Sequence, residues 1–432
     1  MTAASASPLR LGIAGLGTVG IGVVKIIQRH ADLLAARSGR PVVITAVSAR
    51  DRTKNRDADL SNYAWEVDPV TLATRDDVDV FVELMGGHEG AARAATEAAL
   101  AAGKDVVTAN KALLAHHGHA LAEMAEAAGR VIRFEAAVAG GIPVIKALTE
   151  GLAGNQIRRV MGVMNGTCNY ILTRMETAGL TYDTVFEEAR QLGYLEADPN
   201  LDVGGIDAGH KLAILAAIAF GTKVSFDDVV LEGIGRISID DIRRAGDMGY
   251  KIKLLGVAQM TGRGLEQRMT PCLVPDSSPL GQLQGGTNMV VLEGDSVGQI
   301  VLRGAGAGEG PTASAVMGDV LDLARGLRLP TFGQPAATLS TPVAAVASAP
   351  AAYYLRLQLM DKPGALAKVA TVLGDAGVSI SRMRQYGHAD TSAPVLIVTH
   401  KTTRDAIDVA IARFPATNVV EGEPVAIRIE EV

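Results

Sequence analysis

The first third of the chain alternates apolar and glycine-rich segments in an order that few folds accept. An apolar run, LRLGIAG, leads into a glycine-rich turn, and the amphipathic stretch IGVVKIIQRHADLLAAR separates it from a second apolar run, PVVITAV. This pattern predicts a strand, a helix and a second strand. The alternation continues to about residue 138. Strands separated by such helices predict a Rossmann-type, doubly wound parallel sheet with helices on both faces.

A glycine motif marks the turn between the first expected strand and its helix. Gly15, Gly17 and Gly20 form G-x-G-x-x-G, with Thr18 and Val19 inside it. In a dinucleotide-binding turn the first glycine allows the tight bend, the second lets a pyrophosphate approach, and the third lets helix and strand pack closely. Glycine-rich turns also arise for steric reasons alone, but the flanking strand and helix favour dinucleotide binding here.

The end of the second expected strand bears on the choice of dinucleotide. It reads Val47, Ser48, Ala49, Arg50 and has no carboxylate to bind the ribose hydroxyls of NAD, while Arg52 and Lys54 follow closely. Arg50 could instead pair with the 2′-phosphate of NADP. We therefore expect NADP, with NAD as an alternative, unless these basic residues form only a solvated loop.

Size, charge and cysteine usage exclude several classes of protein. The 432 residues suffice for about three domains. Two cysteines, Cys168 and Cys272, are too few for a disulfide framework and fit a reducing compartment. The net charge of −6 argues against nucleic acid or an anionic membrane as the main partner. The N-terminal MTAASASPLR lacks the features of a secretory signal and no apolar run reaches a membrane span of roughly 18 residues, so we expect a cytoplasmic protein.

The remaining chain divides by pattern. Residues 138–303 mix longer strands and helices and predict a second, α+β domain. Residues 304–338 return to a glycine turn and a helix, which we expect to pack back on the first domain, 1–137. The small, uncharged stretch 339–352 has linker composition. Residues 353–432, with a loop at GHADTSAP, predict the order βαββαβ of a ferredoxin-like fold.

A lysine at the start of an expected helix is a candidate functional residue. In VVTANKALLA, Asn110 is suited to cap the helix, which places Lys111 in the first turn, where the helix dipole disfavours a cation. A ligand can bind beyond the carboxyl end of such a strand, so Lys111 could face the nicotinamide or the substrate. The alternative is an exposed surface lysine.

The segment GYLEADPNLDVGGIDAGHKLAIL carries the strongest candidate. Asp207 and Lys211 are four residues apart and would share a helix face, for which an exposed salt bridge is the simplest interpretation. However, residues 212–220 contain no polar side chain, which places Lys211 at the edge of a dry site. Glu196 and Asp202, on an expected loop, could supply carboxylates that tune the lysine. Such a lysine can act as a proton donor or acceptor.

Three further features are less specific. Glu135 ends an expected strand before a glycine-rich bend whose carbonyls could bind a cation, although a purely structural bend fits equally well. Cys168 has no histidine near it in the sequence and is expected to be a buried structural thiol. His116, His117 and His119 lie on an expected helix without the neighbours of a metal motif, which favours a solvated face.

Over nearly its whole length the chain resembles homoserine dehydrogenase of the long bacterial type, which ends in an ACT domain. The resemblance rests on GLGTVG at 15–20, TANKALL at 108–114, EAAVAGGIPVI at 135–145, NGTCNYIL at 165–172 and GYLEADPNLDVGGIDAGHK at 193–211. It implies NAD(P)-dependent interconversion of L-homoserine and L-aspartate 4-semialdehyde, on the route from aspartate to threonine and methionine. It also implies a homodimer or homotetramer.

The resemblance implies roles for individual residues. Lys211 would relay the proton to or from the reacting oxygen, and Lys111 would lie beside the substrate and the nicotinamide. Substrate binding would fall to Glu196, Asp207, Asp202 and Gly193. A monovalent cation, usually sodium, would bind Glu135 and the carbonyls of Val138, Gly140 and Ile142. The loop from Gly306 to Gly308 would close over the nicotinamide, with Gly308 in contact with the cofactor.

The C-terminal region carries its own expectation. The DKPG turn at residues 361–364 heads an expected helix whose N-terminus could receive an amino-acid carboxylate. Threonine is the first candidate for a feedback inhibitor there, and a ligand-free dimerisation module is the alternative. For the whole chain, two rival hypotheses are a catalytically silent regulatory protein and an oxidoreductase acting on another amino-acid aldehyde.

Overall fold

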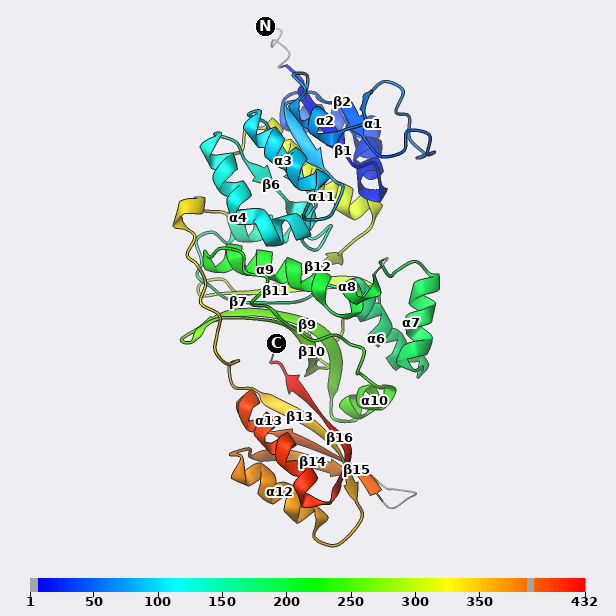
Figure 1. The fold of residues 1–432 in the computed structure, drawn as a ribbon, viewed down its shortest axis with the longest axis vertical. Coiled ribbons are helices and arrows are strands. Elements are labelled where there is room, and N and C mark those ends of the chain that lie inside the picture. The colour runs from blue at the N-terminus through cyan, green and yellow to red at the C-terminus, as the bar shows by residue number, and fades with distance from the viewer. Residues whose placement is uncertain (1–6, 197, 387–391, 432) are drawn as a thin grey trace.

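The computed structural model describes residues 7–196, 198–386 and 392–431. The start of MTAASASPLR and most of the GHADTSAP loop lie outside the described residues. The molecule is elongated, with the glycine-motif domain at one end, a mixed sheet in the middle and the ferredoxin-like unit at the other end (Figure 1). No helix in the described ranges is long and apolar enough to cross a membrane.

The first domain is the expected parallel sheet. Its six strands lie in the order β3-β2-β1-β4-β5-β6, and every pairing is parallel, which confirms the Rossmann-type prediction. The strands are β1 (Leu9–Ala14), β2 (Val42–Ser48), β3 (Ala64–Glu66), β4 (Val80–Glu83), β5 (Asp105–Thr108) and β6 (Ile132–Arg133). The helices among them are α1 (Thr18–Ser38), α2 (Pro69–Thr74), α3 (Ala91–Ala101) and α4 (Lys111–Ala127).

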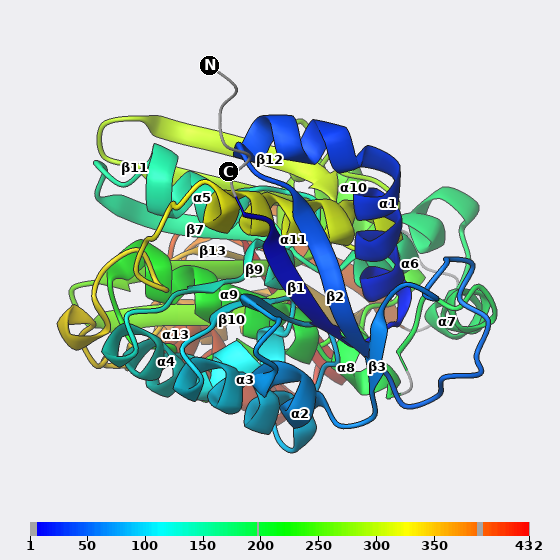
Figure 2. The ribbon, with the colours of Figure 1, turned by 90° about the horizontal axis from the view of Figure 1, so that it is seen from above.

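Helices cover both faces of this sheet because its strands are apolar on both sides. Helix α1 packs beside α11 (Glu309–Ala324) on one face, and α2, α3 and α4 line the other (Figure 2). The α11 side chains share a buried cluster with β1 and α1, so we propose that 304–338 belongs to the first domain. The glycine turn is sterically closed: a Cβ on Gly15, which has φ +98°, would lie 2.3 Å from the Leu84 carbonyl, and one on Gly20 would lie 1.9 Å from the Gly15 carbonyl.

The middle of the molecule is a mixed sheet with helices on one side. Its strands are β7 (Ile157–Val163), β9 (Tyr250–Thr261), β10 (Gly264–Pro275), β11 (Thr287–Gly294) and β12 (Gly298–Ala305), with β8 (Val230–Leu231) beside β10. The principal helices are α6 (Gly166–Ala178), α7 (Tyr182–Gln191), α8 (Pro199–Val203), α9 (Ile206–Phe220) and α10 (Ile239–Asp247). Helix α9 lies between α4 and this sheet, and residues 207–217 are all buried. The apolar stretch 212–220 is therefore buried as expected as far as residue 217, and residues 218–220 are partly buried.

The C-terminal region confirms the βαββαβ order. Its elements are β13 (Ala352–Met360), α12 (Ala365–Asp375), β14 (Ile380–Gln385), β15 (Ser392–Thr399), α13 (Arg404–Arg413) and β16 (Val420–Ile429). The unit is not suspended on a free linker. Strand β16 pairs in parallel with β10, which joins both units into one ten-stranded sheet. Within the 339–352 segment, Val343 O accepts the Leu265 amide at 2.8 Å and Ala345 N donates to Leu265 O at 3.0 Å.

A buried group of charges secures this joint. Arg268 on β10 donates to Glu266 at 3.0 Å and also to Glu430, which follows β16. Arg428 on β16 donates to the same Glu430 carboxylate. The side chains of Arg268 and Glu430 are only 4% and 5% exposed. Such a network tolerates no missing partner, because an unpaired charge in this setting is costly.

Candidate active site

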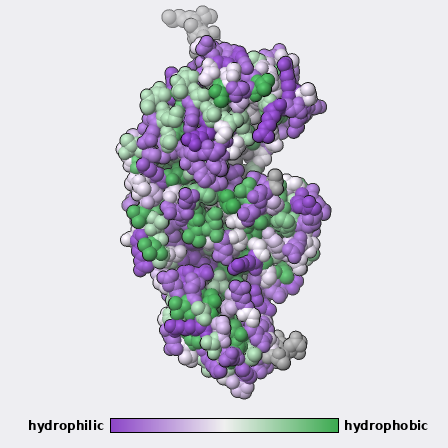
Figure 3. Space-filling model, in the orientation of Figure 1, coloured by the Kyte–Doolittle hydropathy of each residue, from purple (hydrophilic) through white to green (hydrophobic). Residues whose placement is uncertain are grey.

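A cavity of about 670 Å³ lies between the first domain and the mixed sheet. The space-filling view is hollowed at this level (Figure 3). The cavity opens beside the carboxyl ends of the parallel strands, where open α/β sheets bind ligands. Its lining includes Thr18, Val19, Ala109, Lys111, Ala137, Ala139, Gly140, Asn165, Thr167, Tyr170, Gly193, Tyr194, Glu196, Asp202, Asp207, Lys211, Asn288, Gly306, Gly308 and Thr312. Lys111, Glu196, Asp202, Asp207 and Lys211 therefore meet in one place, whereas Arg50 and the proposed cation ligand Glu135 do not line this cavity.

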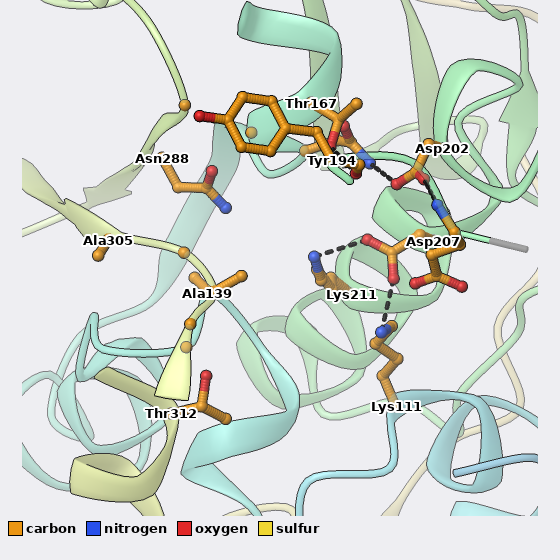
Figure 4. Close-up of a pocket in the computed structure, with 18 of the residues that line it drawn as sticks. Lys111, Ala139, Thr167, Tyr194, Asp202, Asp207, Lys211, Asn288, Ala305 and Thr312 are labelled. Atoms are coloured by element: carbon orange, nitrogen blue, oxygen red, sulfur yellow. Dashed lines mark hydrogen bonds and ion pairs between the residues drawn. The ribbon is translucent and has the colours of Figure 1, made fainter. Parts of the chain in front are cut away.

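Two lysines share one carboxylate in this cavity (Figure 4). Lys211 Nζ donates to Asp207 Oδ2 at 2.7 Å and to the Met164 carbonyl at 3.0 Å. Lys111 Nζ lies 2.7 Å from the other oxygen, Asp207 Oδ1. The side chains of Asp207 and Lys211 are only 8% and 10% exposed, so their contact is not the exposed salt bridge that spacing alone allowed.

The charges of this cluster sustain one another. Burial opposes the charge of Asp207, but Lys211 and Lys111 more than offset it and lower its pKa well below the usual range. Burial likewise opposes the charge of Lys111, and Asp207 raises its pKa above the usual value. The Lys211 ammonium lies in a poorly solvated space, where its positive charge acts strongly on any anion that develops beside it.

Lys111 is held by the predicted cap. Asn110 Oδ1 accepts the Leu113 amide at 3.0 Å, and Asn110 Nδ2 donates to the Gly87 carbonyl at 2.6 Å. Behind it, the buried Glu83 at the end of β4 accepts the Thr108 hydroxyl at 2.6 Å. These contacts fix the start of α4, and Lys111 extends into the cavity as a functional residue would rather than into solvent.

The acidic residues before α9 differ in what they do. Asp202 lies on α8 and not on the expected loop, because Asp198 caps a short helix there. Its Oδ1 accepts Asn165 Nδ2 at 3.0 Å and its Oδ2 accepts the Glu196 amide at 2.9 Å. Asp202 thus orders the segment that carries Glu196. Burial raises the pKa of Glu196, with Lys111 opposing, and Gly193 makes the turn after α7 at φ +70°.

The side of the cavity that the starts of α1 and α11 form suits a nucleotide. Gly17, Thr18 and Val19 lie at the start of α1, and an added Cβ on Gly17 would meet nothing within 4 Å, which leaves room for a phosphate. Gly308 caps α11 on the opposite side. Arg50 is exposed just beyond β2.

A basic residue beyond Lys54 also approaches the glycine turn. Arg56 Nε donates to the Leu16 carbonyl at 3.2 Å, and its guanidinium lies 5.5 Å from the Trp65 ring. Arg56 had not been singled out from the sequence.

Glu135 lies in an unusual environment. Strand β6 ends at Arg133, so Glu135 opens a 3₁₀ turn (Glu135–Ala137) instead of ending a strand. Its two carboxylate oxygens accept the amides of Ile145 at 2.9 Å and Lys146 at 2.8 Å. Burial and the neighbouring Asp319 raise the pKa of Glu135 to about 7. The adjacent bend has left-handed backbone, with φ +50° at Gly140.

The remaining candidates take structural positions. Cys168 is fully buried, and its Sγ lies 3.3 Å from the Asp202 carbonyl, as expected of a structural thiol. His116 is exposed, with its ring centroid 4.3 Å from that of His88, and His117 Nε2 lies 2.7 Å from Glu89. In the part of the chain that is described, no group of three or more histidines, cysteines and acids is arranged to hold a metal ion.

Several lining residues had not been singled out from the sequence. They are Asn165, Thr167, Tyr170, Tyr194, Asn288 and Thr312. The motif NGTCNYIL held a usable signal, because an asparagine directly before a helix can cap it by accepting the backbone amide three residues further on. Asn165 Oδ1 does accept the Cys168 amide at 2.8 Å. Nothing in the strand TNMVVLEG marks Asn288.

Comparison with known proteins assigns each part of the chain. Family models described as "Homoserine dehydrogenase, NAD binding domain", "Homoserine dehydrogenase" and "ACT domain" match residues 15–135, 143–321 and 353–414. A homoserine dehydrogenase of Neisseria gonorrhoeae is 43% identical over 433 residues, covering 98% of this chain and 99% of that protein.

Solved structures that resemble this chain include members of the same family. A homoserine dehydrogenase from Thiobacillus denitrificans superposes with a TM-score of 0.92 at 40% identity, covering 98% of each chain. A hyperthermophilic archaeal homoserine dehydrogenase in complex with NADPH superposes with a TM-score of 0.64 at 25% identity, covering 75% of this chain and 99% of that one.

Proposed function

The chain belongs to the homoserine dehydrogenase family, and on that premise we propose how its own residues carry out the reaction. It is an NAD(P)-dependent oxidoreductase that interconverts L-homoserine and L-aspartate 4-semialdehyde. A bound nicotinamide supplies or accepts the hydride. The single observation that carries the proposed mechanism is the sharing of Asp207 by Lys111 and Lys211 within the cavity.

Lys211 is the proposed proton donor and acceptor at the substrate oxygen. Its ammonium has three N–H bonds, of which Asp207 and Met164 O take two, so one is left for the substrate. During reduction the aldehyde oxygen gains negative charge, which the ammonium stabilises and then protonates. During oxidation the same nitrogen receives the hydroxyl proton.

Lys111 supports this step from the other domain. Its contact with Asp207 holds the carboxylate between two cations, and its remaining N–H bonds are available to the substrate and the nicotinamide side of the cavity. Asp207 and Glu196 are the proposed partners of the substrate ammonium, with Gly193 shaping the turn before Glu196. Asp202 acts through its hydrogen bond to the Glu196 amide.

NADP is the proposed cofactor, with NAD as the alternative. Strand β2 ends at Ser48 without a carboxylate, and Arg50 is exposed just beyond that end, which suits a 2′-phosphate. The residues at the glycine turn fit the dinucleotide, because Gly17 leaves space and the starts of α1 and α11 face the same cavity. The archaeal relative with NADPH supports this choice.

A monovalent cation, sodium, is proposed at Glu135 with the carbonyls of Val138, Gly140 and Ile142. The Glu135 carboxylate suits a cation, because each of its oxygens accepts only one backbone amide and keeps a lone pair that can bind the ion. The role of the ion would be structural, holding the bend that lines the cavity through Gly140.

The C-terminal ACT domain is proposed to bind threonine at the turn before α12 and so to regulate the enzyme. We further propose a homodimer or homotetramer, in the cytoplasm, in keeping with two free and buried cysteines. The ACT family match supports an amino-acid effector.

The function is tested by following the absorbance of reduced nicotinamide with purified protein, L-homoserine and either NADP or NAD at alkaline pH. The absorbance should rise, and faster with NADP. Folded protein that gives no rise, and that also fails to oxidise NADPH with L-aspartate 4-semialdehyde, would contradict the proposal.

A further inference from the structure

One buried polar group in the cavity has no partner among the residues that the structure describes. Asn288, the second residue of β11, is 1% exposed, yet no hydrogen bond from those residues reaches its Oδ1. Its amide points into the cavity, on the far side from Asp207 and Lys111 (Figure 4). A buried amide atom left without a partner loses the hydrogen bonds that it would make in water, which destabilises the protein. A group of this kind beside a substrate cavity therefore calls for a ligand that pairs with it.

The backbone around Asn288 is shaped to keep its amide in place. A Cβ on Gly306 would lie 1.9 Å from Asn288 Nδ2, so a side chain there would displace the amide. A Cβ on Gly166 would lie 2.6 Å from the Gly286 carbonyl and 3.4 Å from Asn288 Oδ1. Two glycine segments that are far apart in the sequence thus close around this one side chain.

The surrounding charges indicate which end of the substrate lies there. Glu196 and Asp207 suit the ammonium, while a carboxylate requires hydrogen-bond donors away from these acids. Helix α6 begins at Gly166, and its first two amides, of Gly166 and Thr167, have no acceptor within the helix. Both residues line the cavity, and the positive end of the helix dipole favours an anion.

We propose that Asn288 recognises the amino-acid zwitterion of the substrate, with Nδ2 donating to the α-carboxylate and Oδ1 accepting from the α-ammonium. The inference deepens the proposed function, because it names the groups that Asn288 reads on the substrate of that site. The two charged groups are carried by one carbon atom, so a single primary amide reaches both. Asn288 thereby selects amino-acid alcohols over plain amino alcohols of the same length.

The experiment compares the wild type with Asn288→Ala and Asn288→Asp. Inhibition constants are measured against L-homoserine for two probes: L-α-aminobutyrate, which keeps the zwitterion, and propanolamine, which is homoserine without its carboxylate. In Asn288→Ala the KM for L-homoserine and the inhibition constant of L-α-aminobutyrate should both rise about 10- to 100-fold, the range expected for hydrogen bonds to charged groups. Asn288→Asp should raise both constants further, because it places a carboxylate next to the carboxylate of the substrate. The inhibition constant of propanolamine should rise less, because this probe has no carboxylate and loses only the contact between its ammonium and Asn288 Oδ1.

Gly306 supplies a second, independent arm. Gly306→Ala should displace Asn288 and weaken L-α-aminobutyrate binding, but in the Asn288→Ala background the same change should weaken it much less, because the side chain it displaces is gone. Additive losses would contradict the proposed contact.

Other outcomes would overturn the proposal. A weakened NADPH affinity with an unchanged KM for L-homoserine would place Asn288 against the cofactor carboxamide. Equal losses for both probes would indicate a general disturbance of the cavity, and no loss would leave Asn288 without a role. Thermal stabilisation by L-α-aminobutyrate, measured on the wild type and Asn288→Ala, tests the contact even if the wild type did not oxidise L-homoserine.

Discussion

Lys111 Nζ and Asp207 Oδ1 lie 2.7 Å apart across the boundary between the parallel-sheet domain and the mixed-sheet domain. Lys111 opens α4, and Asp207 lies in the first turn of α9, where the helix dipole favours a carboxylate. Their ion pair completes the cluster that also holds Lys211. The catalytic arrangement therefore exists only when the two domains are docked, and a residue from each is required.

Removing the charge of Asp207 should disable both lysines. In Asp207→Asn two ammonium groups lose their shared partner, and the pKa of Lys111, which Asp207 raises, should fall. We expect kcat/KM for aldehyde reduction to drop about 100-fold, and the alkaline limb of its pH profile to move to lower pH. Asp202→Asn is the matched control, since Asp202 contacts neither lysine, and a similar shift in that variant would contradict the assignment.

Arg50→Ala should weaken NADPH selectively. Loss of a charge-assisted contact to the 2′-phosphate should raise the KM for NADPH about tenfold and leave that for NADH unchanged. Arg52→Ala is the control, because the Arg52 guanidinium lies 5.9 Å from the Trp65 ring and is assigned no phosphate contact. Equal losses with both cofactors would remove Arg50 from the specificity site.

Sodium should stabilise the protein in a pH-dependent way through Glu135. Burial and Asp319 raise the pKa of Glu135 to about 7, so the folded protein keeps a proton that an unfolded glutamate has lost above about pH 5. Stability from this group therefore falls as the pH rises from about 5 to about 7. A cation binds the ionised form and reverses that loss.

The corresponding measurement is the Tm in sodium chloride and in choline chloride. The difference between the two salts should be larger at about pH 8 than at about pH 6, and Glu135→Gln should abolish it. A difference that is independent of pH, or that persists in Glu135→Gln, would exclude this site.

Breaking the charge network at the joint should destabilise the chain. Arg268→Met leaves the buried Glu266 without its arginine and Glu430 with Arg428 alone, which should cost about 3 kcal/mol and lower the Tm. Arg404→Met, which removes an exposed pair with Asp408, should change the Tm very little. Equal effects in the two variants would show that the network does not hold β10 to β16.

Threonine should lower the velocity of the full chain through the ACT domain. Gly364 has φ +83° at the start of α12, so Gly364→Val should distort the turn and relieve the inhibition while leaving the uninhibited velocity unchanged. A wild type indifferent to threonine would support a ligand-free dimerisation module instead. Truncation is a poorer test, because removing β16 exposes the edge of β10.

Much of this arrangement was predictable because its signals are local. Period and glycine spacing predicted the parallel sheet and its turn, and cap and helix patterns identified Lys111 and Lys211. Local patterns could not show that Lys111 meets Asp207, since that depends on how two domains dock. Asn288 was missed because a lone asparagine in a strand has no signature before its neighbours are known. The pairing of β16 with β10 likewise depends on contacts between distant segments.

The most direct test of the mechanism is chemical rescue of Lys211→Ala. This variant should bind NADPH normally but oxidise L-homoserine about 10²- to 10⁴-fold more slowly, the usual contribution of a general acid or base. Methylamine, supplied in solution, should restore part of the rate in proportion to its concentration. A Lys211→Ala enzyme with nearly full activity would contradict the assignment of Lys211 as the proton relay.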